Sequence, residues 1–123
     1  MNVALWILQA LMALLFLVAG SAKVFQPIDK LAQRYGWMGK VPPPFIRFIG
    51  VCELAGALGL IAPEAASILP KLTLAAAGGL SALMACAVIF HVTRREIPEG
   101  ARALVILLVM LFITIGRWML API

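Results

Sequence analysis

Four long apolar segments restrict the folds that this sequence can adopt. They cover residues 3–25, 44–62, 72–92 and 103–120. Each is close to the ~20 residues that an α-helix needs to cross a hydrocarbon core of ~30 Å. Because lipid offers no hydrogen bonds, a spanning segment must satisfy its own backbone, which favours helices. We therefore predict an all-α fold, a bundle of four transmembrane helices in a single integral membrane domain over residues 1–123.

The composition supports a chain embedded in lipid. Hydrophobic residues make up 64% of the sequence and charged residues 12%, whereas soluble domains carry roughly 25% charged residues. The net charge of +5 does not indicate a nucleic-acid partner, since the basic residues lie between apolar runs instead of forming a patch. The first segment has no Lys or Arg before it and is too long for a signal-peptide core, so we expect it to be a transmembrane helix of the mature protein.

The basic residues predict an orientation. Only Lys71 and Arg117 flank the second connection and the chain end. The other basic residues flank the first and third connections: Lys23, Lys30, Arg34, Lys40, Arg47, Arg94, Arg95 and Arg102. The positive-inside rule then places those connections in the cytoplasm and both termini outside. We expect a multi-pass protein of a bacterial-type inner membrane, with its termini on the periplasmic side.

The first connection, residues 26–43, predicts a short amphipathic helix in the membrane interface. Its apolar side chains follow helical spacing, and its polar ones occupy the other positions. Trp37 and Met38 are expected to anchor it. A packed connector and a lid over a ligand site both stay open. The apolar positions are Ile28, Leu31, Ala32 and Tyr35.

Small residues predict how the second and third segments pack. Helices in lipid associate through close approach of small side chains. The second segment carries Cys52, Gly56 and Gly59, and the third carries Ala75, Gly79, Ala82 and Cys86. An antiparallel hairpin centred on Leu69 would place Cys52 opposite Cys86, Gly56 opposite Ala82 and Gly59 opposite Gly79. The register would allow a disulfide or redox pair, but without a CxxC motif the cysteines are interpreted first as packing residues, and oxidation of the two stays open.

Glu53 lies in the middle of the second apolar segment. A carboxylate there costs about 2.5–3.5 kcal/mol even on lenient insertion scales, so it needs a partner, a proton or water. Lys23 ends the first segment and His91 ends the third, in the same half of the membrane. We predict that the three side chains turn inward and meet, directly or through water. A structural ion pair, a neutral buried acid, and contact with a ligand, a proton or quinone all stay open.

Other catalytic and metal-binding signatures are missing from the sequence. It contains one histidine and no second ligand at metal-binding spacing, so no metal centre is expected. It also lacks a P-loop, a dinucleotide fingerprint and a Ser/His/Asp arrangement, and no catalytic residue is assigned. Arg117, Trp118 and Trp6 are expected to anchor the outer interface, with Arg117 reaching toward water.

Several segments together resemble the DoxX-like family of small four-helix membrane proteins. The first apolar segment ends in Ala-Gly-Ser-Ala-Lys-Val-Phe, Gly-Trp follows in the connection, and the second segment contains Val-Cys-Glu-Leu-Ala-Gly-Ala-Leu-Gly. A third segment ending in His91 and a last one with Gly-Arg complete the resemblance, with Lys23 and Glu53 as the best matches. The family takes its name from a membrane subunit of a thiosulfate:quinone oxidoreductase, and relatives are implicated in membrane redox complexes or receptor assembly.

Three functions follow as hypotheses. The first is a subunit or anchor of a membrane redox complex that contacts quinone or a partner oxidoreductase through Lys23, Glu53 and His91. The second is a binder or carrier of a small or lipid-like molecule. The third is an assembly or scaffolding protein whose charged residues are purely structural. In each case the bilayer is the first partner, and a homo-oligomer stays open.

Overall fold

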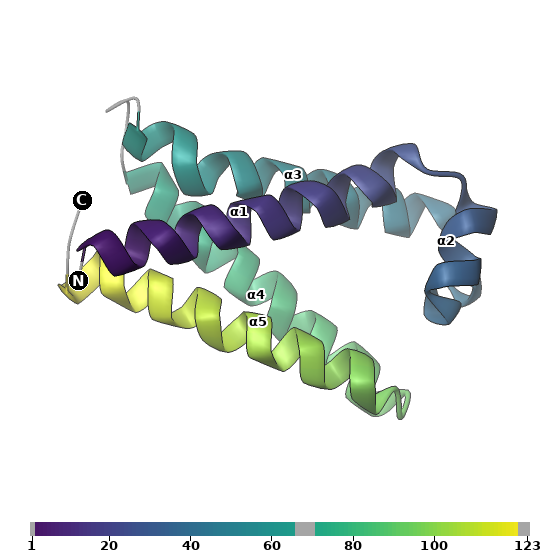
Figure 1. Ribbon diagram of the computed structural model, residues 1–123. Coiled ribbons are helices and arrows are strands. Elements are labelled where there is room, and N and C mark those ends of the chain that lie inside the picture. The colour runs from purple at the N-terminus through teal and green to yellow at the C-terminus, as the bar shows by residue number, and fades with distance from the viewer. Residues whose placement is uncertain (1, 66–70, 121–123) are drawn as a thin grey trace.

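The computed structural model describes residues 2–65 and 71–120, and these form a bundle of helices (Figure 1). Four of its helices are long and apolar enough to cross a membrane. This confirms the predicted all-α four-helix bundle with a short helix between the first two spans. The elements are α1 (Asn2–Phe25), α2 (Ile28–Arg34), the 3-10 helix η1 (Gly36–Lys40), α3 (Pro43–Ala65), α4 (Lys71–Thr93), α5 (Ile97–Ile115) and the π-helical segment η2 (Gly116–Leu120).

The fourth long helix begins earlier than hydropathy predicted. It starts at Ile97 and not at residue 103. Pro98 lies in its first turn, where a missing N–H costs no hydrogen bond and the fixed φ suits a helix. Glu99 makes this turn polar, and Arg102 follows in the next turn. A boundary drawn from apolar residues alone therefore misses a turn that local backbone preferences stabilise.

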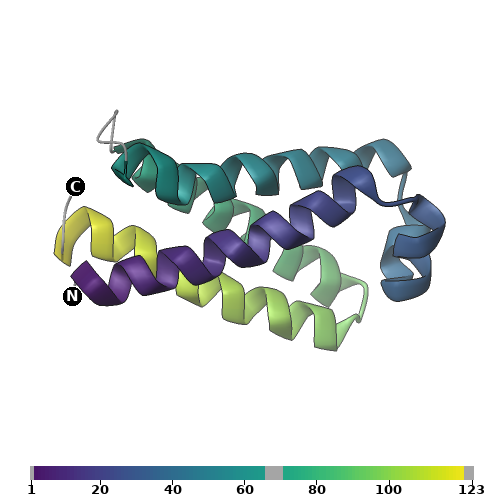
Figure 2. The ribbon, with the colours of Figure 1, turned by 45° about the horizontal axis from the view of Figure 1, so that its top comes forward.

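The long helices form two pairs that diverge like the arms of a V. α1 packs along α3, α4 packs along α5, and α3 also contacts α4. Figures 1 and 2 show the pairs close together where α1 begins, and separated at the end where α2 lies. At the closed end, a Cβ added to Gly116 would lie 2.6 Å from a side-chain carbon of Leu5, so η2 lies directly against α1.

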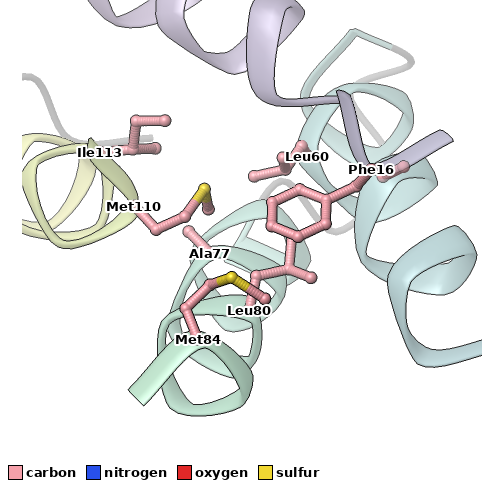
Figure 3. Packing of buried hydrophobic residues seen from close by; sticks show 8 residues of the cluster. Phe16, Leu60, Ala77, Leu80, Met84, Met110 and Ile113 are labelled. Atoms are coloured by element: carbon pink, nitrogen blue, oxygen red, sulfur yellow. The ribbon is translucent and has the colours of Figure 1, made fainter. Parts of the chain in front are cut away.

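The main core lies where the two pairs meet. Its buried side chains come from all four long helices: Phe16, Ala57, Leu60, Ala77, Leu80, Met84, Met110 and Ile113. Figure 3 shows the labelled members converging, among them Phe16, Leu60 and Met110. Many large apolar side chains face outward instead, among them Val18, Leu58, Ile89 and Leu108. Such a surface is expected where the surroundings are acyl chains.

The connection between α1 and α3 packs against the protein. The predicted apolar face of α2 is confirmed, because Leu31 is fully buried while Asp29 and Lys30 are exposed. The expectation that Met38 anchors the interface is wrong. Met38 is only 3% exposed and packs with Leu31 and Ile46 in a second core cluster. Burying both side chains in one cluster holds α2 and η1 on the bundle.

The α3–α4 packing is antiparallel as predicted, but its contacts differ. A Cβ added to Gly59 would lie 2.6 Å from the Cβ of Ala76, and one added to Gly56 would lie 2.5 Å from the Leu80 side chain. Gly79 has nothing within 4 Å of an added Cβ. The predicted centre of the hairpin, Leu69, lies outside the described residues.

The predicted small-residue stripe of α4 is therefore turned away from the main core, and its Cys86 lines a cavity described below. Its four members are all exposed: Ala75, Gly79, Ala82 and Cys86. The physical reason is that α4 must also bury Ala77, Leu80 and Met84 in the core. Burying these side chains fixes the rotation of the helix and leaves the small stripe on the opposite side. Both Cys52 and Cys86 are free thiols.

Candidate functional site

Two glycines bring α1 and α3 into close contact beside Glu53. A Cβ added to Gly20 would lie 2.8 Å from the carbonyl oxygen of Gly50. One added to Gly50 would lie 2.8 Å from the Cβ of Lys23. Both distances are shorter than Cβ atoms tolerate, so the two backbones approach only because these residues lack side chains. The close crossing sets Lys23 next to Glu53.

Lys23 and Glu53 form an ion pair between the helices. Lys23 Nζ lies 2.6 Å from Glu53 Oε1, and the side chains are 13% and 3% exposed. The prediction that these two residues meet directly is confirmed. Because both charges are largely removed from solvent, each depends on the other, and removal of one partner from such a pair typically costs about 3–5 kcal/mol.

Arg47 fixes the end of the helix that carries Lys23. Its Nη1 donates hydrogen bonds to the carbonyl oxygens of Lys23, Val24 and Gln26 at 2.8, 3.1 and 2.7 Å. The last carbonyls of a helix lack intrahelical partners and carry partial negative charge, so a guanidinium there is favourable. The sequence had indicated Arg47 only as a marker of orientation. In the structure it ties α3 to the C-terminal end of α1.

His91 lies at the end of α4 and bonds to a residue that the sequence did not single out. His91 Nδ1 lies 2.9 Å from Glu96 Oε1. The backbone wraps to make this contact: Arg95 N–H donates to the Val92 carbonyl, and Glu96 N–H donates to the His91 carbonyl. This is the Schellman arrangement, with Arg95 at a φ of 59° where glycine is usual. Glu96 could have been found only by recognising this turn.

Trp37 connects the η1 segment to the end of α4. Its ring centroid lies 5.7 Å from that of Phe90 and 5.1 Å from that of His91, both nearly edge-on. Aromatic pairs favour this geometry, and each such pair contributes about 0.5–1.5 kcal/mol beyond area burial. The contacts place the α2–η1 connection across the open end of the V. The connection thus packs over the open end of the V, and the lid over a ligand site stays a prediction.

A cavity of about 630 Å³ lies between the two helix pairs under this connection. All four long helices and the α2–η1 connection line it. Its ionisable residues include Lys23, Glu53 and His91, together with Glu99 and Arg102 of α5. Most of the remaining wall is apolar or aromatic, including Phe16, Leu31, Trp37, Met38, Phe45, Phe48, Ile49, Met84 and Phe90. Small-molecule sites typically have this size and a few polar groups in an apolar wall.

The structure thus brings the three predicted residues to one cavity, but not into one cluster. Lys23 and Glu53 bond to each other, whereas the hydrogen bond of His91 goes to Glu96. Among the residues that the structure describes, no group of three His, Cys, Asp or Glu side chains is arranged to hold a metal ion. The cavity presents ionic and hydrogen-bonding side chains to a ligand, next to an apolar wall.

A second buried polar network lies at the closed end of the bundle. Arg117 of η2 is 1% exposed. Its Nε donates to Gln9 Oε1 at 2.6 Å and its Nη1 to Asn2 Oδ1 at 2.5 Å, while Gln9 Nε2 donates to the Leu60 carbonyl at 2.7 Å. The expectation that Arg117 reaches outward to water is wrong, because these acceptors hold it inside. Gln9, a lone amide in an apolar segment, was the available signal.

Comparison with known proteins bears on the identity of the chain. A model of the DoxX-like family matches residues 7–114. No curated protein and no solved structure matches the chain. The matched region contains every described residue of the cavity wall, from Leu15 to Ile106.

Proposed function

The chain belongs to the DoxX-like family, and from that premise we propose that it is an integral membrane protein that binds a membrane-soluble, quinone-like molecule in the cavity between its helix pairs. The observation that carries the proposal is an apolar chamber of about 630 Å³ with an almost buried ion pair in its wall. A flat, apolar molecule with polar oxygens matches both parts of that chamber. Its ring would pack on the aromatic wall, and its oxygens would accept hydrogen bonds.

The donors that such a head group would use are the charged groups of the wall. Lys23 bonds to Glu53 through one contact and is 13% exposed, so the ammonium group keeps further N–H donors. His91 and Arg102 lie on the same wall. A purely structural ion pair would need no chamber beside it. The chamber therefore favours a ligand site over the scaffolding hypothesis.

Quinone binding would also give the chain a part in membrane redox chemistry. A soluble or membrane oxidoreductase would supply the electrons, and this chain would hold the quinone and anchor the partner. The resemblance to the family of a quinone-linked oxidoreductase subunit supports this role. A lipid-like ligand is the alternative occupant, and identification of the bound molecule distinguishes the two.

The proposed orientation sets the open end of the V in the cytoplasm. The predicted cytoplasmic side holds α2, η1, the α4–α5 turn and the adjoining helix ends, which together carry eight of the ten basic residues: Lys23, Lys30, Arg34, Lys40, Arg47, Arg94, Arg95 and Arg102. Cytoplasmic loops of membrane proteins are enriched in Lys and Arg. At a site after Gly36, a reporter enzyme that works only in the cytoplasm should be active, and one that works only in the periplasm should be inactive. For fusions before α1, the periplasmic reporter should be active and the cytoplasmic one inactive. The reverse pattern would refute the orientation.

The test of the ligand site uses two matched variants of α4. Ala87 lines the cavity, whereas Ala82 is exposed on the outer side of the same helix. Ala87→Trp should fill the chamber, and Ala82→Trp should leave it unchanged. Native mass spectrometry of protein extracted in polymer-bounded lipid discs would measure retained small molecules. We expect a retained quinone in the wild type and in Ala82→Trp, and its loss in Ala87→Trp. Equal retention by both variants, or none by the wild type, would refute the proposal.

A further inference from the structure

A second hollow lies on the outer side of α1. It is an open groove of about 850 Å³, and α2 overhangs one end. Apolar side chains of α1 line most of it, including Leu11, Leu14 and Val18, which are 54%, 60% and 63% exposed. Gln26, Arg34 and Tyr35 line it near the overhang. The groove therefore has a long apolar floor and a polar, cationic end.

The floor is long enough to hold an acyl chain that spans one leaflet of a bilayer. Residues 11–25 of α1 extend over about 21 Å at ~1.5 Å per residue, while half of a hydrocarbon core is about 15 Å. The overhanging helix lies at the end of α1 that carries Lys23 and Gln26, where the chain leaves its first span. An acyl chain lying along this floor would place its head group at Arg34.

Arg34 is held in a position that suits an anionic group. Its guanidinium carbon lies 5.4 Å from the centre of the Tyr35 ring. Among the described residues, carboxylates pair with Lys23, His91, Arg94 and Arg102, and none pairs with Arg34. Guanidinium groups bind phosphate through two parallel hydrogen bonds, and stacking on an aromatic ring leaves those N–H groups available.

We propose that this groove binds one anionic phospholipid, with its phosphate on Arg34 and an acyl chain along Leu14 and Val18. Positive charge at one end and an apolar floor match the two parts of such a lipid. The groove and the inner cavity share Leu15, Ala19, Ala22 and Tyr35 in their walls, but the proposed lipid contacts at Leu14, Val18 and Arg34 line only the groove. The test of the lipid site is therefore independent of the proposed quinone-like ligand.

The chain offers a matched control for the charge. Lys30 lies on α2, is exposed like Arg34, and does not line the groove. Arg34→Gln and Lys30→Gln each remove one positive charge from the same short helix. If Arg34 binds the phosphate, Arg34→Gln should weaken binding of the anionic lipid more than Lys30→Gln does. If the protein only attracts anionic lipid in general, the two changes should weaken binding equally. Val18→Trp adds bulk to the floor at an exposed position and tests the acyl-chain half of the site.

The experiment is native mass spectrometry with phosphatidylglycerol or phosphatidylcholine titrated into delipidated protein. The wild type should retain one phosphatidylglycerol in preference to phosphatidylcholine. Arg34→Gln should weaken phosphatidylglycerol binding about fivefold, which corresponds to about 1 kcal/mol for one basic residue near a membrane surface. Lys30→Gln should change phosphatidylglycerol binding less than twofold. Val18→Trp should weaken the binding of both lipids. Soluble glycerophosphate should not compete, because it lacks the chain.

Three outcomes would overturn the proposal. Equal binding of the two lipids by the wild type would leave an unselective annular lipid in the groove. Equal losses in Arg34→Gln and Lys30→Gln would indicate general electrostatics. The wild type could also appear as a dimer that binds no added lipid. If Val18→Trp abolishes that dimer mass, the groove is a site of self-association.

Discussion

Gly20 and Gly50 face each other across the α1–α3 crossing so closely that a Cβ on Gly20 would lie 2.8 Å from the Gly50 carbonyl oxygen. This contact determines how near the helices lie, and thereby sets Lys23 beside Glu53. At the same time, Gly56 and Gly59 pack against α4. Glycines on two faces of α3 thus hold the bundle together around the cavity.

Substitution of Gly50 should destabilise the protein. In Gly50→Ala, the new Cβ would lie 2.8 Å from both Lys23 Cβ and Val24 Cγ2 and 2.9 Å from the Gly20 carbonyl oxygen, so the helices must separate. Overpacking of this kind typically costs about 1–3 kcal/mol. Gly79→Ala is the control, since an added Cβ there meets nothing within 4 Å and alanine is the better helix former. Thermal unfolding in detergent should show a lower Tm only for Gly50→Ala; equal effects would argue against the crossing.

The Lys23–Glu53 pair predicts a non-additive double mutant. Lys23→Met alone leaves the Glu53 carboxylate almost buried without its partner, which typically costs about 3–5 kcal/mol. The double change Lys23→Met with Glu53→Leu removes both charges and should be less destabilising than the single change. The measurement is the free energy of unfolding of the two single variants and the double variant. Additive effects would mean that the residues do not interact.

The network at the closed end predicts a cost for removing Gln9. Gln9→Leu removes the acceptor at Arg117 Nε and the donor to the Leu60 carbonyl. Loss of a hydrogen-bond partner for a buried group costs about 1–3 kcal/mol, and more for a charged one. Gln33→Leu, at an exposed position of α2, is the control. A Gln9→Leu protein as stable as that control would show that the network contributes little.

The turn between α4 and α5 predicts a stabilising substitution. Arg95 has a φ of 59°, in the left-handed region that costs non-glycine residues about 1–2 kcal/mol. Arg95→Gly should relieve that cost and raise the Tm. Arg94→Gly, at the neighbouring position, should not raise the Tm, because the turn needs no left-handed residue there. That change also removes the contact of Arg94 Nε with Glu96 Oε1 at 3.4 Å. A lower Tm for Arg95→Gly would mean that its side chain matters more than its backbone.

The sequence predicted the four helices and the Lys23–Glu53 pair because both follow from the cost of polar groups in lipid. A carboxylate in an apolar helix leaves few alternatives to a nearby cation. The rotation of α4 could not be predicted in the same way. Small residues mark one face of that helix, but the burial of Leu80 and Met84 turns it the other way.

The remaining differences between the sequence-based predictions and the structure have a common origin. The position of Glu96 depends on a backbone turn, and the burial of Arg117 depends on acceptors from the far end of the chain. The cavity depends on the angle between two helix pairs, which is set by contacts such as Gly59 with Ala76. Each of these depends on tertiary geometry that hydropathy and spacing do not contain.

The most direct test of the ligand site is quenching of Trp37 fluorescence by a short-tailed quinone. Trp37 lines the cavity, and replacing Trp6 and Trp118 by Phe leaves it as the single tryptophan. In that single-tryptophan protein, added quinone should quench Trp37 fluorescence until it saturates, with the concentration dependence of one binding site. Ala87→Trp adds a fluorophore, so Ala87→Phe serves as the filled cavity here and Ala82→Phe as its control. We predict that Ala87→Phe abolishes saturable quenching and that Ala82→Phe preserves it. Quenching that rises linearly with quinone in all three proteins would contradict a binding site in this cavity.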